Sequence, residues 1–170
     1  MAVEEQLLND SDYRCGWVDR PECGQKLTIP NRKVTKLALL VHKHGVPTGD
    51  VYLRIRKVSD DAVILEKLWG VAGDLPADGF PDWIEVEFVT PVIINEEVRL
   101  LIEGESPTNT NSIDYRYQNS DVKADENLTC GEPGDFTEPV DTDGAYKYTY
   151  EVTKPAGGSG PANLVAAGII

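Results

Sequence analysis

The chain has 170 residues, 29 of them acidic and 16 basic, which leaves a formal net charge of −13. This charge argues against nucleic acid or anionic lipid as the main partner, because both require a basic surface. The length fits one domain with tails, and no apolar run reaches the roughly 18 residues of a membrane span, so we expect no membrane insertion.

The first 23 residues are predicted to form an N-terminal arm outside the main domain. They contain turn-forming residues around Asn9 and Pro21, and Trp17 between these turns is the expected anchor of the arm. The main domain is predicted to span residues 24–152.

Residues 24–152 contain short runs in which apolar and polar residues alternate, separated by turns of Gly, Pro, Asp or Asn. Such alternation leaves one face of a strand buried and the other wet, as in antiparallel sheets. Repeated strands of this kind indicate an all-β, two-sheet sandwich. The predicted strands are 25–29, 34–43, 51–56, 63–69, 84–89, 98–103, 113–117 and 145–152.

Local composition adds detail to this pattern. Pro30 and Asn31 are predicted to turn the chain between the first two strands, and Pro91 should lie just past a strand or on an edge. Strand 63–69 is expected at a sheet edge because its alternation is poor. Residues 118–144, rich in acidic residues and Gly, hold at most short strands.

Residues 153–170 differ in composition from the domain and are predicted to form a C-terminal tail. A Gly- and Pro-rich linker over 155–161 precedes an apolar segment, residues 163–170. We expect this segment to pack on, or add a strand to, a neighbouring subunit. The residues assigned to assembly are Leu164, Val165, Ile169, Ile170 and Trp17.

Several motifs follow one another in the order found in a known family. The most specific is the turn Gly-Val-Pro-Thr-Gly-Asp at residues 45–50, which leads into the strand that follows it. Residues 13–151 as a whole resemble the jelly-roll β-sandwich domain, similar to carbohydrate-binding modules, of secreted bacterial proteins and of phage and archaeal-virus structural proteins. The other matching pieces are 24–27, 83–88, 91–95, 98–102, 113–117 and 143–151.

The resemblance implies a jelly-roll sandwich that serves as a decoration, tail-fibre or adhesion module. The chain lacks the aromatic-Gly-Gly run that usually precedes the last strand of the family, and residues 135–144 stand in its place. We therefore predict a virion structural protein, a capsid decoration or tail-associated subunit. It would assemble with copies of itself and with a major capsid or tail protein, in the virion or otherwise outside the cell. The alternative is a carbohydrate-binding or adhesion module that binds glycans.

Two sets of alternating tyrosines are the candidate ligand-binding residues. Tyr115 and Tyr117 share one face of their strand, as do Tyr146 and Tyr148 on theirs. Exposed on a concave sheet, such rings could stack on sugars. The other interpretation is that they fill the rim of the core, with each hydroxyl finding a partner near the edge.

Asp141 and Asp143 resemble the start of a calcium-binding loop, with further acidic residues in the same segment. Calcium takes six to eight oxygen ligands, which clustered acidic loops supply, although the full EF-hand spacing is absent. Carbohydrate-binding modules often carry a structural calcium, so the resemblance adds weight to this cofactor. A plain acidic turn is the alternative.

The cysteines and histidines leave two questions open. Cys15 and Cys23 could close a small disulfide loop and leave Cys130 free, or all three could be reduced thiols of a protein made in the cytosol. His42 and His44 are two apart on a predicted strand and share one face. This spacing could bind a metal if a third ligand were present. Leu37, Leu39 and Val41 take the opposite, buried face, so we expect both histidines to be solvated.

Sequence motifs of catalysis are missing from the chain. It contains no GxSxG, HExxH or P-loop pattern, and its acidic residues are too numerous to single out a glycosidase pair. We predict that the protein is not an enzyme.

Overall fold

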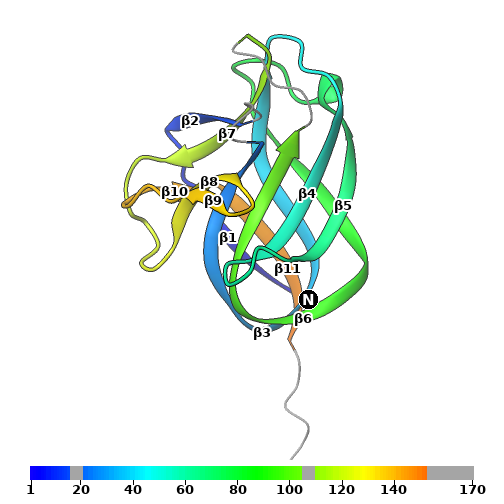
Figure 1. Ribbon diagram of the computed structural model, residues 1–170, viewed down its shortest axis with the longest axis vertical. Helices are drawn as coiled ribbons and strands as arrows, with labels where there is room; N and C mark the ends of the chain where they lie inside the picture. Colours follow the sequence, from blue (N-terminus) through cyan, green and yellow to red (C-terminus); the bar gives the residue numbers. More distant parts are fainter. Residues whose placement is uncertain (16–20, 105–109, 153–170) are drawn as a thin grey trace, which may run out of the picture.

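The computed structural model describes residues 1–15, 21–104 and 110–152, and these residues form an antiparallel β-structure (Figure 1). The all-β antiparallel prediction is confirmed. A short 3-10 turn, η1 (Ala72–Asp74), interrupts the strands. The strands are β1 (Ala2–Gln6), β2 (Ser11–Cys15), β3 (Glu22–His44), β4 (Asp50–Lys57), β5 (Val63–Val71), β6 (Asp82–Gly104), β7 (Ser112–Gln118), β8 (Asn127–Glu132), β9 (Asp135–Thr137), β10 (Asp143–Gly144) and β11 (Tyr146–Val152).

Two strands of 23 residues each, β3 and β6, form the spine of the molecule and pair along almost their whole length. The sequence predicted two strands in each of these segments. The predicted turn at Pro30 and Asn31 is wrong, because β3 continues through both residues. Likewise β6 continues through Pro91, where a strand was expected to end.

Irregular pairing explains how these strands bend without ending. The β3–β6 register shifts between Ile29 and Arg32 and again between Val34 and Lys36, as at a β-bulge. Asn31 has a φ of 50°, in the left-handed region that Asn tolerates better than most residues. Pro91 lies in the second irregular stretch, where a missing N–H costs no ladder hydrogen bond.

All described strands belong to one hydrogen-bonded network, with the main order β1-β11-β3-β6-β4-β5. Along the edge of β3 that does not face β6, the strands β8, β11 and β7 pair in turn. The short strands β2, β7, β8, β9 and β10 gather on one side of the molecule, and β4 and β5 lie on the other (Figure 1). Strand β5 ends the order, which confirms the predicted edge position of 63–69.

The predicted N-terminal arm is part of this network. Strand β1 pairs with β11, and β2 pairs with β7 over five residues. The boundary expected near residue 23 therefore does not separate an arm from the domain. Trp17 lies outside the described residues, as does the predicted tail 153–170.

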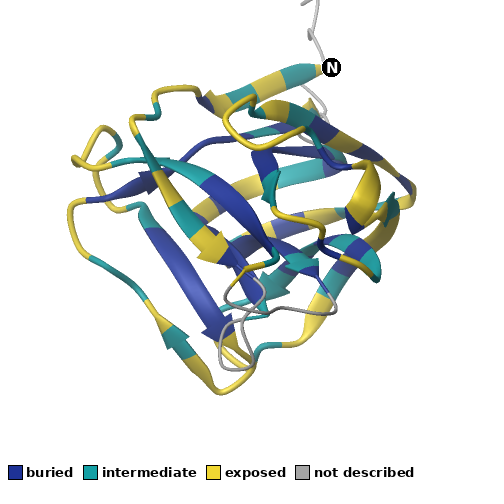
Figure 2. Ribbon diagram, turned by 90° about the horizontal axis from the view of Figure 1, so that it is seen from above, coloured by how far each residue is buried: buried dark blue, intermediate teal, exposed yellow. Residues whose placement is uncertain are grey.

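One hydrophobic core draws on both halves of the two long strands. Leu27 and Ile29 from the first half of β3 pack in the same cluster as Leu37, Leu39 and Val41 from the second. The core residues of β3 have odd numbers before and after the irregular stretches, and the one exception, Val34, lies between them. The bulges therefore bend the strand and leave the apolar faces of both halves toward the core. Buried residues alternate with partly exposed ones along β4, whereas residues 37–42 of β3 are all buried. Figure 2 shows both continuous buried stretches and stretches of mixed burial along the strands.

Candidate functional site

Three of the four candidate ligand-binding tyrosines are inside the protein. Tyr115, Tyr146 and Tyr148 are at most 1% exposed, and Tyr117 is half-buried. The Tyr115 hydroxyl donates to the carbonyl oxygen of Ala145 at 3.2 Å. The prediction of exposed rings is therefore wrong for these three residues, because they occupy core-facing positions of β7 and β11. Their packing matches the alternative interpretation, in which tyrosines fill the rim of the core.

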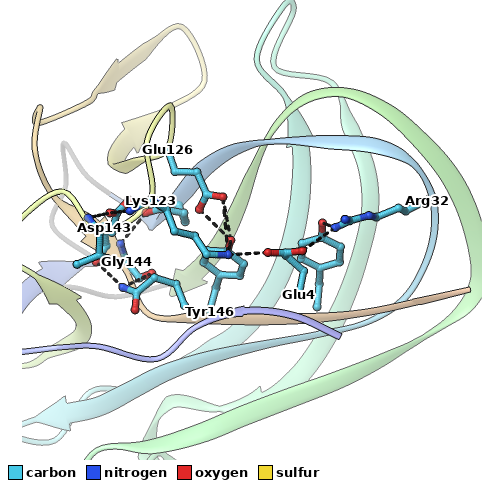
Figure 3. A network of polar contacts seen from close by, with 11 residues as sticks. Glu4, Arg32, Lys123, Glu126, Asp143, Gly144 and Tyr146 are labelled. Atoms are coloured by element: carbon cyan, nitrogen blue, oxygen red, sulfur yellow. Dashed lines mark hydrogen bonds and ion pairs between the residues drawn. The ribbon is translucent and has the colours of Figure 1, made fainter. Parts of the chain in front are cut away.

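The hydroxyl groups of Tyr146 and Tyr148, both on β11, take part in a network of polar contacts (Figure 3). Tyr146 donates to Glu126 at 2.8 Å and accepts from the Lys123 ammonium at 3.0 Å. Glu4 of β1 bridges Lys123, at 2.7 Å, and Arg32 of β3, at 3.0 Å. Arg32 also donates to the hydroxyl of Tyr148. The network thus joins β1, β3 and β11 to the acidic segment 118–144.

Asp143 anchors the other end of the network. One carboxylate oxygen accepts from the Gln25 side-chain amide at 2.8 Å, and the other accepts from the backbone N–H groups of Val122 and Lys123 at 2.7 and 2.9 Å. The Gln25 oxygen in turn accepts from the N–H of Gly144 at 2.6 Å. Asp143 therefore holds the loop before β8 against β3.

These contacts bear on the predicted calcium site. The donors above occupy both oxygens of Asp143, and Asp141 is exposed with a φ of 60°. Over residues 1–15, 21–104 and 110–152, no group of three or more His, Cys, Asp or Glu side chains is arranged to hold a metal ion. The structure gives Asp143 a different role, as an acceptor for N–H groups.

The environment shifts the acidity of several network groups. Burial opposes the ionisation of Glu4, but the Lys123 and Arg32 cations outweigh it and lower the pKa of this carboxyl. Burial raises the pKa of Glu126. Burial also raises the pKa of Tyr146, and it brings that of Tyr148 to about 12. Both tyrosines are therefore neutral at physiological pH, so Tyr146 keeps the proton that it donates to Glu126.

The two histidines are not both solvated, contrary to the prediction. His42 is 3% exposed, because β7 pairs beside it and Asp12 of β2 lies 3.0 Å from its Nε2 atom. Asp78 contacts the Nδ1 atoms of both His42, at 3.6 Å, and His44, at 3.2 Å. The pairing of β2 with β7 thus brings an acidic residue of the expected arm onto the histidine face.

A second ionic cluster ties four strands together. The buried carboxylate of Glu22 on β3 accepts from Arg54 and Arg56 of β4, each at 2.9 Å. Arg54 also pairs with Glu66 of β5 and Glu103 of β6. Burial raises the pKa of Glu103, although Arg54 opposes this shift. The cluster of two arginines and three carboxylates thus links β3, β4, β5 and β6.

The free edge of the sheet presents apolar side chains. Strand β5 has exposed Val63, Leu68 and Val71, at 44–46% exposure, and among the described strands it pairs with β4 alone. A groove of about 350 Å³ lies between β5 and the irregular stretch of β6. Its lining includes Ile64 and Leu65 from β5 and Phe88, Val89 and Val92 from β6. This edge and groove, termed the β5 edge below, form the candidate interaction site.

Sequence reasoning identified only part of these sites. It placed strand 63–69 at an edge, but it did not find the groove, since Phe88–Val92 were expected to end a strand. It also missed Gln25 and Lys123, and it considered Glu126 only as one of the acidic residues near the predicted calcium loop. Gln25 offered a signal, because a polar residue stood where the alternation of β3 requires an apolar one. The assembly residues Leu164, Val165, Ile169 and Ile170 lie outside the described residues.

The chain matches no protein-family model, and no curated protein is significantly similar to it. None of the helices in the described part of the chain is long and apolar enough to cross a membrane.

Proposed function

We propose that the protein is a non-enzymatic virion structural protein, a capsid decoration or tail-associated subunit. It assembles with copies of itself and with a major capsid or tail protein. The observation that carries the proposal is the β5 edge, where unpaired strand groups adjoin exposed apolar side chains. Edges of this kind are templates for pairing with another chain, and exposed apolar patches mark interaction surfaces.

The occupant of the β5 edge is residues 163–170 of a neighbouring copy. This segment carries no charged side chain and is mostly apolar, which suits the apolar part of the groove. That part is formed by Ile64, Leu65, Phe88, Val89 and Val92, beside Glu66, Lys67 and Thr90. Eight residues in extended conformation span about 26 Å, close to the length of β5. Strand addition supplies backbone hydrogen bonds, and alternate side chains enter the groove.

The end of β11 lies on the same side of the molecule as the groove. Val152 and Ile94 are both opposite Arg32, one on each edge of β3, so they are about 10 Å apart. Residues 153–162 can span at most roughly 33 Å. Two copies packed side by side can therefore exchange their 163–170 segments across a short distance, as in other exchanged oligomers.

Light scattering coupled to size-exclusion chromatography tests this assembly. The full chain should elute at a multiple of its 18.7 kDa mass. Deletion of residues 155–170 should give a monomer, and so should Leu68→Lys, because a charge at an edge strand opposes pairing. Val140→Lys is the matched control, since Val140 is also 75% exposed but lies between β9 and β10, on the side of the molecule away from β5.

Monomeric wild-type protein at all concentrations, or an oligomer unchanged by the deletion, would contradict the assembly. Circular dichroism should show that each variant stays folded. The virion location has its own test: antibodies against the chain should label purified particles. Signal confined to the soluble fraction would contradict that location.

The alternative, a carbohydrate-binding module that uses exposed tyrosines, has weaker support because Tyr115, Tyr146 and Tyr148 are buried. Tyr117 is half-buried and packs edge-on against Tyr13, with ring centroids 6.4 Å apart. Specific glycan binding by the wild type that is lost in Tyr117→Ala would favour this alternative over the structural role.

A further inference from the structure

All three cysteines of the chain meet in the core. They come from β2, β3 and β8, and Cys15, Cys23 and Cys130 are each 0% exposed and unpaired as thiols. Nothing in their sequence spacing predicts this meeting, since Cys130 is more than a hundred residues from the other two.

Cys23 occupies the middle of the group. It is directly opposite Cys130 in the antiparallel pairing of β3 with β8. Opposite residues of neighbouring strands point to the same face, with Cβ atoms about 4.5–5.5 Å apart. A disulfide needs about 3.5–4.5 Å between Cβ atoms, so closing this bond requires a shift of about an ångström.

Cys15 approaches Cys23 from the other side. Its Sγ atom lies 3.6 Å from the carbonyl oxygen of Ile102, the residue that is opposite Cys23 on β6. Cys15, Cys23 and Cys130 belong to one cluster of buried side chains. Cys23 thus has a partner on each side.

We propose that Cys23 is the shared sulfur of an internal disulfide site, with Cys130 its preferred partner and Cys15 its alternate. With a glutathione disulfide as oxidant, Cys23–SH and Cys130–SH lose two electrons and two protons and form the S–S bond. The glutathione disulfide gains them and becomes two glutathione thiols. Cys15 remains a thiol, and its thiolate can attack the Cys23 sulfur and release Cys130.

Folding controls when this bond forms. Burial raises the pKa of the Cys15 thiol, and burial together with the neighbouring thiols raises that of Cys23 well above its usual range. Only the thiolate is nucleophilic, so the folded, reduced protein should resist oxidation and alkylation. The bond forms while β8 is still pairing with β3, in an oxidising compartment or on release from the cell.

The test is refolding of the full chain from denaturant in a buffer of reduced and oxidised glutathione. Free thiols are then alkylated under denaturing conditions, and intact masses are measured. Wild type should contain one internal disulfide and one alkylated thiol. Cys15→Ala and Cys130→Ala should each keep one internal disulfide, whereas Cys23→Ala should have none.

Peptide mapping of the wild type identifies the bonded pair even if a variant fails to fold. Cleavage at Asp19 or Glu22 is required, because trypsin leaves Cys15 and Cys23 in one peptide that ends at Lys26. A Cys15–Cys130 bond, an internal bond in Cys23→Ala, or three free thiols in the refolded wild type would each overturn the proposal. This test is independent of oligomer size and hence of the proposed function.

Discussion

Asp143 shows how the protein's own donors surround a buried carboxylate that the sequence places in a calcium-like loop. The Asp-Thr-Asp-Gly sequence resembles a cation-binding loop, yet the Asp143 oxygens accept hydrogen bonds from the side chain of Gln25 and the backbone of Val122 and Lys123. Three N–H donors thus satisfy both oxygens of this buried carboxylate. At the residue scale, the acidic segment is held by the protein's own donors.

Replacing Asp143 by Asn should destabilise the protein by about 2–3 kcal/mol. The side chain would offer one acceptor oxygen where the carboxylate offers two, so at least one buried donor would face an NH2 group. Urea unfolding measures the change. Asp141→Asn is the matched control at an exposed site and should stay within about 0.5 kcal/mol of wild type.

The same pair of variants tests calcium. A structural calcium bound by Asp141 and Asp143 would make Asp141→Asn as damaging as Asp143→Asn, and EDTA would lower the wild-type melting temperature. Equal melting temperatures with EDTA and with added calcium are the result expected from the hydrogen bonds to Asp143.

Glu126 should make stability depend on pH in the direction opposite to an ion-paired acid. Because its folded-state pKa is raised, the folded protein binds the proton more strongly than the unfolded chain. Its contribution to stability is therefore present at low pH and is lost as pH rises through the folded pKa. Glu126→Gln resembles the protonated form, so it should gain stability relative to wild type between pH 4 and pH 7.

Urea unfolding of both proteins at the two pH values measures this difference. Lys123→Met is a useful comparison, because it removes the cation that partly offsets the shift of Glu126. A difference between Glu126→Gln and wild type that stays constant with pH would contradict the assigned environment of Glu126.

At the scale of elements, the bent strands β3 and β6 decide the architecture. The bulges bend β3, so that Leu27 and Leu39 pack in the same core. The strand also pairs with β8, β11 and β7, one after another, along one of its edges. A reversal at Pro30 and Asn31 would have produced two separate strands. The sequence does not distinguish these outcomes, because the same residues favour turns and bulges.

Asn31 offers a test of the bulge. Its left-handed φ of 50° is poorly suited to a β-branched residue, so Asn31→Val should destabilise the protein by about 1–2 kcal/mol relative to Asn31→Gly. Both variants remove the Asn side chain, so their difference in urea unfolding isolates the backbone. Equal stability of the two variants would show that residue 31 does not hold this conformation.

At the scale of the whole molecule, charge and apolar surface have opposing effects on association. A net charge of −13 makes free copies repel one another, and salt screens this repulsion. The apolar groups of the β5 edge supply attraction that does not depend on charge. The proposed assembly therefore combines repulsion over most of the surface with attachment at one edge.

Period-two alternation is a local property, so the sequence alone was enough to determine the all-β antiparallel class, most strand positions and the edge strand at 63–69. The contacts of Gln25 with Asp143, of Glu4 with Lys123 and of Cys23 with Cys130 were decided only by the tertiary structure. These partners are far apart in the chain and become neighbours through strand order and register. Alternation specifies which face of a strand is buried, but it carries no information about which strand lies beside it.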